Sequence, residues 1–267
     1  MTLEARALSL AYGERTAVRD ATLRVEPGEM LALIGPNGSG KSTLLRGLAR
    51  LMRPRAGGVW LDGADLWSLS AREVARRLAI LPQTPDAGLD LTVEELVARG
   101  RYPHQSLLRG LGARDLEVIA GAIADADLEG LRARPLGTLS GGERQRAWIA
   151  LALAQEPRIL LLDEPTAFLD ARHSVEVMEL LRRLQAGGLT VLVVLHDLLL
   201  AARYADRVAA LAEGRIVAEG APESVFRPDL LTSVFGIEMA LLEDPGSGRA
   251  IPVPAVPAAA AARGGVR

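Results

Sequence analysis

The sequence predicts an α/β protein whose mixed, largely parallel sheet is flanked by helices. In its second half, apolar strands alternate with helical segments, and this alternation is typical of a parallel sheet covered on both faces. Near residue 38, a glycine-rich turn stands between an apolar strand and a helix. The length of 267 residues fits one large domain or two small ones, and 49% of the residues are hydrophobic.

The first third of the chain is predicted to be rich in short strands. Turn signals at Gly13 and over 26–29 separate the first three of them. Ser70 precedes a helical pattern and Glu73 follows three residues later, which is the spacing of a capping box. The predicted elements are strands 3–12, 15–26 and 30–35, helix 41–51, strand 57–63, helix 70–78 and strand 79–83.

Residues 86–155 are predicted to be mostly helical, because apolar residues recur there at helical spacing. This helical subdomain is inserted in a main domain over 1–240. Residues 241–254 should form a hairpin around Asp244–Gly246, followed by a flexible Ala/Pro-rich tail over 255–267. After the helical insert we expect strand 158–163, helix 171–186, strand 189–195, helix 197–204, strands within 207–220 and helix 229–236.

Composition excludes several functions. The chain has no cysteine, which excludes disulfides, thiolate metal sites and a cysteine nucleophile. The net charge of −2, without a long basic run, argues against nucleic acid as the main partner. The N-terminus lacks a signal-peptide pattern, and no window reaches the roughly 18 apolar residues of a membrane helix. We therefore expect a soluble protein that can still dock on a membrane protein.

The glycine-rich turn matches the phosphate-loop pattern G-x-x-x-x-G-K-[ST] from Gly35 to Ser42. Backbone N–H groups of such a loop point at phosphate oxygens, and the following helix adds its dipole. Lys41, the single lysine of the chain, is expected to reach the β- and γ-phosphates, while Ser42 supplies a hydroxyl to Mg²⁺. The predicted nucleotide-binding residues of the loop are Gly35, Pro36, Asn37, Gly38, Ser39, Gly40, Lys41, Ser42 and Thr43.

Two carboxylates follow the apolar run 159–162. Asp163 is expected at the edge of the sheet, where it can hold hydrated Mg²⁺. Glu164 comes next, and a second carboxylate can polarise the attacking water. The pair predicts hydrolysis of a nucleoside triphosphate. Taken alone, the same residues could merely end a strand and begin a turn.

The stretch "LSGGERQR", Leu139 to Arg146, resembles the signature motif of ABC-type ATPases. The rest of that family's motifs are present in order: Tyr12 resembles the aromatic that stacks on adenine, Gln83 the Q-loop glutamine and His196 the switch histidine. "EPTAFLD" resembles the D-loop and ends at Asp170. The resemblance covers residues 1 to about 240. It implies a P-loop NTPase core with an N-terminal antiparallel β subdomain and an inserted helical subdomain.

The resemblance also implies a function for each motif. Two ATP molecules would lie between two chains of a homodimer, with each signature completing the phosphate site of the other chain. Glu164, His196 and Gln83 are then the catalytic residues, and Asp170 lies across the dimer interface. The implied metal-binding residues are Ser42, Gln83 and Asp163, for Mg²⁺. The implied signature residues are Leu139, Ser140, Gly141, Gly142 and Glu143.

Two residues depart from the family pattern. Glu143 stands where glutamine is commonest, a variant that should not abolish activity. Phe168 stands in the D-loop where a small residue is usual, which bears on dimer packing. Tyr12 and Gln83 have plainer alternatives, as a half-buried strand aromatic and a strand-end residue. His104 and His173 lack a comparable context and are taken as surface or packing residues.

A single ATPase domain without a fused membrane span resembles a separate importer subunit. Its implied partners are integral-membrane permease subunits and, indirectly, a substrate-binding protein; the implied location is the cytoplasmic face of the cell membrane. The stretch 92–108, with Arg101 to His104, resembles ATPases for ferric-siderophore, haem and cobalamin uptake, although a generic helix-end turn is the alternative. The alternatives are an importer of another substrate class, an exporter ATPase, and a non-transport ATPase of DNA repair, chromosome structure or translation.

Overall fold

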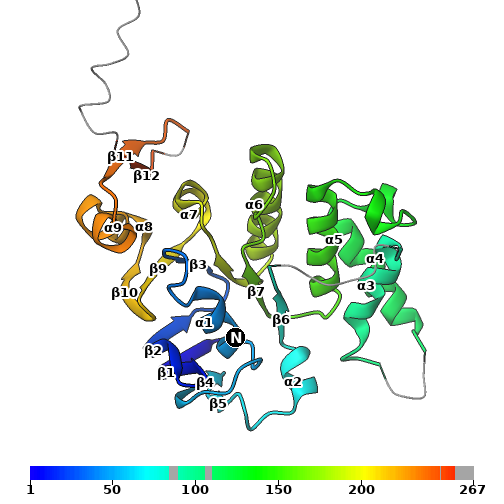
Figure 1. Ribbon diagram of the computed structural model, residues 1–267. Coiled ribbons are helices and arrows are strands. Elements are labelled where there is room, and N and C mark those ends of the chain that lie inside the picture. Colours follow the sequence, from blue (N-terminus) through cyan, green and yellow to red (C-terminus); the bar gives the residue numbers. More distant parts are fainter. Residues whose placement is uncertain (84–89, 106–109, 247, 256–267) are drawn as a thin grey trace, which may run out of the picture.

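The computed structural model describes residues 1–83, 90–105, 110–246 and 248–255 (Figure 1). The strands are β1 (Leu3–Tyr12), β2 (Arg15–Val25), β3 (Met30–Ile34), β4 (Ala56–Leu61), β5 (Ala64–Asp65), β6 (Leu78–Leu81), β7 (Ile159–Asp163), β8 (Thr190–Val194), β9 (Arg207–Ala212), β10 (Arg215–Gly220), β11 (Met239–Glu243) and β12 (Ala250–Pro254). The helices are α1 (Lys41–Leu48), α2 (Ala71–Ala75), α3 (Val93–Ala98), α4 (Ala113–Asp125), α5 (Gly141–Leu153), α6 (Ala171–Ala186), α7 (Leu198–Tyr204), α8 (Pro222–Val225) and α9 (Pro228–Phe235).

The central sheet has six strands in the order β10-β9-β3-β8-β7-β6. Its strands are parallel except β10, which pairs antiparallel with β9 at one edge. Because side chains alternate along a strand, Leu31 and Leu33 of β3 enter one core, while Met30, Ala32 and Ile34 enter the other. This explains why β3, β7 and β8 are apolar without alternation, since both faces of a parallel sheet are buried.

The N-terminal strands form a second, antiparallel sheet in the order β2-β1-β4-β5. Helix α1 packs between this sheet and the central one, because Leu44, Leu45 and Leu48 share a core with both. Helices α5, α6 and α7 contribute to the core on the opposite face of the central sheet. The predicted fold, with a P-loop core and an antiparallel N-terminal sheet, is confirmed.

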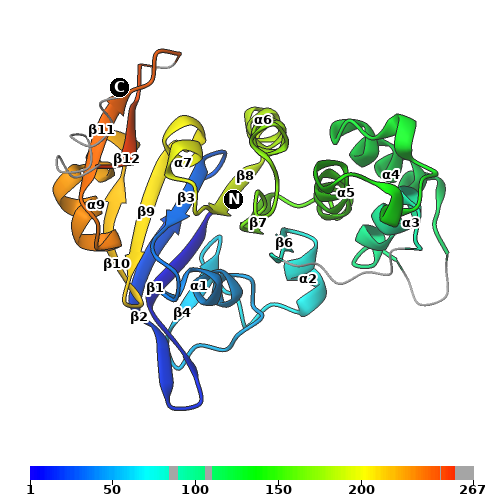
Figure 2. The same cartoon turned by 45° about the horizontal axis from the view of Figure 1, so that its top comes forward.

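Helices α3, α4 and α5 lie together beyond β6, at the end of the central sheet (Figures 1 and 2). Thr92 and Ser140 begin α3 and α5 with capping boxes, to Glu95 and Glu143. Buried Arg101 follows α3 and donates to Ala154 O at 2.7 Å, Asp115 Oδ1 at 2.8 Å and Glu156 Oε2 at 2.8 Å. These contacts hold the start of the segment between α3 and α4 against the C-terminal end of α5.

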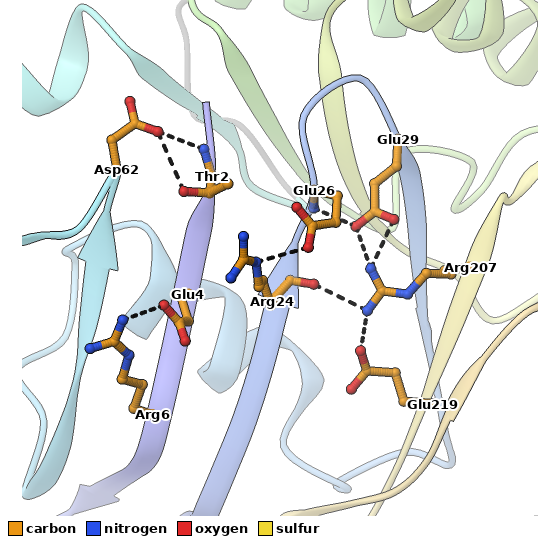
Figure 3. A network of polar contacts seen from close by, with 9 residues as sticks. All are labelled: Thr2, Glu4, Arg6, Arg24, Glu26, Glu29, Asp62, Arg207 and Glu219. Atoms are coloured by element: carbon orange, nitrogen blue, oxygen red, sulfur yellow. Dashed lines mark hydrogen bonds and ion pairs between the residues drawn. The ribbon is translucent and has the colours of Figure 1, made fainter.

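A polar network joins the ends of several strands on one side of the fold (Figure 3). Arg207 of β9 donates to both carboxylate oxygens of Glu29, at 2.7 and 2.9 Å, and to the carbonyl of Arg24 at 3.2 Å. It also contacts Glu219 of β10. Burial raises the pKa of the Glu29 carboxyl, although Arg207 and a backbone N–H oppose the shift. The network ties the N-terminal sheet to the central one.

Several predicted boundaries differ from the observed ones. The helix predicted over 41–51 ends at Leu48, because Arg50 adopts a left-handed conformation, with φ of 63°, and its guanidinium binds Leu66 O and Leu69 O. Short helix α8 and strand β5 were not predicted. Residues 84–89, 106–109, 247 and 256–267, which include parts of the predicted helical insert and nearly all of the predicted tail, lie outside the described residues.

The C-terminal segment forms an antiparallel hairpin of β11 and β12, with Leu241 opposite Pro252. The hairpin lies beside α7 and α9 (Figure 2). Across the part of the chain that the structure describes, no helix combines the length and apolarity needed to cross a bilayer.

Candidate active site

The glycine loop after β3 has a backbone that other residues could not adopt. Gly35 has a φ of +148°, and a Cβ there would lie 2.1 Å from the carbonyl oxygen of Leu211. Gly40, just before α1, has a φ of +105°, and a Cβ there would lie 2.5 Å from Ala17 O. The glycines therefore let the loop wrap tightly between β9 and β2, as the sequence predicts.

Lys41 begins α1 and is 5% exposed. Its ammonium donates to the carbonyl oxygens of Gly35 at 2.9 Å and Pro36 at 3.0 Å, so it lies under the loop. Burial lowers the pKa of Lys41, and the carboxylates of Glu164 and Asp163 oppose that shift. A buried cation that is held only by carbonyls and distant carboxylates favours an anionic ligand.

Ser42 and Asp163 lie in contact, although 121 residues separate them. The Ser42 hydroxyl donates to Asp163 Oδ1 at 2.9 Å. Asp163 ends β7 and is 8% exposed, and burial raises the pKa of its carboxyl. The structure therefore brings together two of the three residues for which magnesium binding is predicted.

Glu164 has a non-glycine backbone in the left-handed region, with φ of 53°. Its N–H donates to Val194 O on β8 at 3.2 Å, which fixes the turn after β7. Its side chain lies between two partners, since Gln83 Nε2 donates to Oε2 at 2.6 Å and His196 Nε2 contacts Oε1. The three predicted catalytic residues thus meet at one carboxylate, and Gln83 contacts Glu164 instead of Asp163.

A cavity of about 950 Å³ opens over the loop. Tyr12 lines it, is 50% exposed, and accepts a hydrogen bond from Arg46 at 3.3 Å through its hydroxyl. Hydrogen bonding with Thr43, and to a lesser degree Arg46, lowers the pKa of Tyr12 against the effect of burial. The exposed ring leaves a face free for a flat partner.

Sequence reasoning missed one wall of this cavity. It consists of β2 and the turn between β9 and β10, with the lining residues Arg15, Thr16, Ala17, Arg19, Glu213, Gly214 and Arg215. Gly214 N donates to Ser39 O at 2.9 Å, and Gly214 O accepts from Arg19 N at 2.7 Å. The turn glycine is visible in the sequence, but its contact with a loop 175 residues earlier is not.

The signature residues lie elsewhere in the chain. None of Leu139, Ser140, Gly141, Gly142 and Glu143 belongs to the described lining of the large cavity. Ser140 is the N-cap of α5: its hydroxyl accepts from Glu143 N at 3.2 Å, and Glu143 Oε2 accepts from Ser140 N at 2.8 Å. This capping lowers the pKa of Glu143. Ser140 and Glu143 line a separate cavity of about 480 Å³ with residues of α6.

Asp170 is the N-cap of α6 and accepts from both the backbone N–H and Nδ1 of His173, each at 2.8 Å. The backbone hydrogen bond lowers the pKa of Asp170. His173 also packs closely on Gly142, because a Cβ at Gly142 would lie 2.3 Å from its ring. Phe168 has a φ of 63° and is 95% exposed, which leaves a large apolar ring on the surface of a single chain.

One buried group in the loop lacks a partner among the described residues. Ser39 Oγ is 3% exposed as a residue and makes no hydrogen bond there. An unpaired buried hydroxyl is costly unless a ligand satisfies it. Together with buried Lys41 and the glycine backbone, it makes the loop a fitting cradle for a phosphate chain.

The strand, glycine loop and helix with a buried lysine define a nucleotide-binding protein of the P-loop class. The family described as ABC transporter matches residues 18–167, more than half of the chain. The chain belongs to the ABC transporter family. The predicted ABC-type ATPase class is thereby confirmed.

Several relatives are transport or import ATP-binding proteins by name. The ferric enterobactin transport ATP-binding protein FepC of Escherichia coli (strain K12) is 46% identical over 253 residues, covering 94% of this chain and 93% of the relative. The probable siderophore transport system ATP-binding protein YusV of Bacillus subtilis (strain 168) is 47% identical, covering 92% and 90%. The hemin import ATP-binding protein HmuV of Myxococcus xanthus (strain DK1622) is 45% identical, covering 95% and 97%.

Solved structures show the same fold. An inward-facing metal-chelate type ABC transporter is 26% identical with a TM-score of 0.84, covering 96% of this chain and 98% of the other. The dimeric structure of MJ0796, a bacterial ABC transporter cassette, is 29% identical with a TM-score of 0.72, covering 82% and 98%.

Proposed function

We propose that this chain is the ATP-hydrolysing subunit of an importer for an iron chelate, such as a ferric siderophore or haem, or for cobalamin. The observation that carries the hydrolytic part is Glu164, held between Gln83 and His196 beside a loop with a buried lysine. The names of the relatives support the iron-chelate class. A non-transport role has no comparable support.

In the proposed reaction, water attacks the γ-phosphorus of ATP. A bond forms between the water oxygen and phosphorus, and the bond from phosphorus to the β,γ-bridging oxygen breaks. Glu164 accepts the water proton through its carboxylate, while Gln83 and His196 hold that carboxylate in place. Lys41 and the loop N–H groups hold the phosphate oxygens, and Tyr12 stacks on the base.

Magnesium fits the oxygen pair of Ser42 and Asp163, whose side chains already lie 2.9 Å apart. Hydroxyl and carboxylate oxygens are ligands that Mg²⁺ prefers, and it commonly keeps several waters and shares phosphate oxygens. When bound, Mg²⁺ neutralises charge on the β- and γ-phosphates. Gln83 contacts Glu164, the neighbour of Asp163 in the chain, and would be the third residue that holds the metal.

The proposed active assembly is a homodimer on a membrane permease. The described lining of the large cavity contains no signature residue, which supports a site that a partner chain completes. Ser140 and the N–H groups at the start of α5 would complete the site of the other chain. The subunit would then lie on the cytoplasmic face of the cell membrane, and a substrate-binding protein would deliver the cargo from the other side.

The catalytic proposal is tested with Glu164→Gln, which keeps the shape of the side chain and removes the base. We expect ATP binding to persist while turnover falls by ~10²–10⁴, the usual contribution of a positioned base. Wild-type turnover in this variant would show that Glu164 is not the base. Lys41→Ala should lower nucleotide affinity as well.

The transport proposal is tested by purifying the tagged chain from detergent-solubilised membranes of its host. A permease recovered in equal copies supports the importer assignment, and its substrate-binding partner identifies the cargo. Recovery only with ribosomes or nucleic acid would contradict transport and leave the hydrolytic site unaffected.

A further inference from the structure

The hairpin of β11 and β12 is bound to α7 by an ion pair whose carboxylate is buried and whose guanidinium is partly exposed. Arg203 donates from Nε to Asp244 Oδ2 at 2.9 Å and from a terminal nitrogen to Oδ1 at 2.8 Å. The side chain of Asp244 is 4% exposed and that of Arg203 is 39% exposed, so the carboxylate is shielded from water while the guanidinium stays partly hydrated. A two-point guanidinium–carboxylate contact fixes geometry as well as charge.

A second arginine, Arg249 of the hairpin, holds the end of the same helix. Arg249 donates to the carbonyl oxygens of Ala202 and Arg203, each at 3.1 Å, and of Ala205 at 3.3 Å. These carbonyls belong to the last turn of α7, where a cation is favoured by the helix dipole. The C-terminal end of α7 is therefore anchored by two arginine contacts.

The other end of α7 carries the switch histidine. His196 stands just before Asp197, the N-cap of α7, whose Oδ1 accepts from Leu199 N at 2.8 Å and Leu200 N at 3.4 Å. Seven residues of helix span about 10 Å, so the anchor lies close to the histidine.

The last turn of α7 is anchored to the hairpin, whereas the first turn borders a cavity. A cavity of about 580 Å³ is bounded on one side by His196 to Leu199 and on the other by the hairpin and the end of α9. The hairpin lies beside α7 (Figure 2), and the cavity between the two is also lined by Arg203 and Asp244.

We propose that the C-terminal hairpin positions His196, and that Arg203 and Asp244 are positioning residues for it. The proposal rests on the proposed function, because it assigns the hairpin to the same hydrolytic site. The path runs from Asp244 through α7 and the Asp197 cap to His196, and His196 contacts Glu164. Loosening the anchor should displace the histidine from the carboxylate that it orients.

The experiment uses the full chain and two variants, Asp244→Asn and the milder Arg203→Lys, which keeps the charge and loses the fork. We expect kcat for ATP to fall roughly 3- to 30-fold, since small displacements at a reacting centre are costly. KM for ATP should stay within about twofold, because the phosphate loop is held by separate contacts. The control is Arg183→Lys, which weakens the exposed Arg183–Asp127 pair on α6.

A spectroscopic readout separates positioning from general loss of stability. The chain has three histidines, so substitution of His104 and His173 in turn assigns each ring signal by NMR. In Asp244→Asn and Arg203→Lys the His196 signal should shift, while the signals of His104 and His173 stay in place. In the Arg183→Lys control, all three signals should stay in place. A fall in kcat with an unmoved His196 signal, or a moved signal with wild-type kcat, would overturn the proposal.

The proposed function can fail separately. If wild-type protein does not hydrolyse ATP, or His196→Ala keeps full kcat, the hydrolytic assignment is wrong, whereas the NMR comparison still reports whether the hairpin holds His196. If Asp244→Asn does not fold, Arg203→Lys carries the test.

Discussion

At Glu143 the chain departs from the commonest signature sequence, and the structure gives this residue a local role. Its carboxylate accepts from Ser140 N and thereby closes the capping box at the start of α5. Glutamine offers the same acceptor, whereas alanine does not. The departure is therefore conservative for the geometry of the signature.

We expect Glu143→Gln to leave stability and ATPase activity close to wild type, and Glu143→Ala to lower the free energy of unfolding by about 0.5–1 kcal/mol. Urea unfolding of both variants checks this. Equal stability of the alanine and glutamine variants would mean that the side chain at position 143 contributes nothing to the cap.

Asp163 links catalysis to the pH dependence of stability. Burial raises the pKa of its carboxyl in the folded protein, so the folded state retains the proton to higher pH than the unfolded chain. Stability is then lost as pH rises from the unfolded pKa, about 3.9, through the raised folded pKa. Asp163→Asn removes this dependence.

The free energy of unfolding of Asp163→Asn minus that of wild type should therefore increase as pH rises from about 4 to about 7. Both proteins are measured without nucleotide or metal. Asp170→Asn is the matched control, because the backbone N–H of His173 lowers the pKa of Asp170, so this variant and wild type should run parallel from about pH 4 to 7 and diverge only at lower pH. Parallel curves for Asp163→Asn and wild type would contradict the raised pKa.

At the scale of elements, replacing Gly121 or Gly100 by alanine should change the free energy of unfolding in opposite directions. Gly121 lies exposed within α4 with no atom within 4 Å of an added Cβ, whereas a Cβ at Gly100 would lie 2.3 Å from Leu151 O. Gly121→Ala should raise the free energy of unfolding by about 0.5–1 kcal/mol through helix propensity. Gly100→Ala should lower it by about 1–3 kcal/mol through overpacking. Denaturant titration measures both, and a loss at Gly121 would contradict the first expectation.

The sequence predicted most elements because local patterns determine them. The apolar runs of β3, β7 and β8 and the capping box at Ser70 are signals within a few residues. It did not predict the early end of α1, since Arg50 turns away to bind carbonyls 16 and 19 residues further along the chain.

The same limit applies to the site. Motifs named the loop, Asp163, Glu164, Gln83 and His196, and the structure brings these residues together. The Gly214 turn behind the loop depends on long-range hydrogen bonds to Ser39 and Arg19, for which the sequence holds no local signal.

At the scale of the whole molecule, one chain of the proposed dimer would hold two halves of different sites. The large cavity has the loop and Glu164, whereas α5, which Ser140 caps, lies beyond β6 (Figure 1). If each half completes the site of a partner, a homodimer has two identical composite sites. The dimeric relative MJ0796 has the same fold.

This arrangement predicts complementation between two inactive variants. Glu164→Gln inactivates the base of its own loop, and Ser140→Arg blocks the signature that a chain lends to its partner. In a mixed dimer both defects fall on one composite site, and the other site is intact. Random pairing makes half of the dimers mixed with one good site of two, so equimolar mixing should restore about a quarter of wild-type ATPase activity. Sites built within single chains would give no gain on mixing, because each chain would keep its own defect.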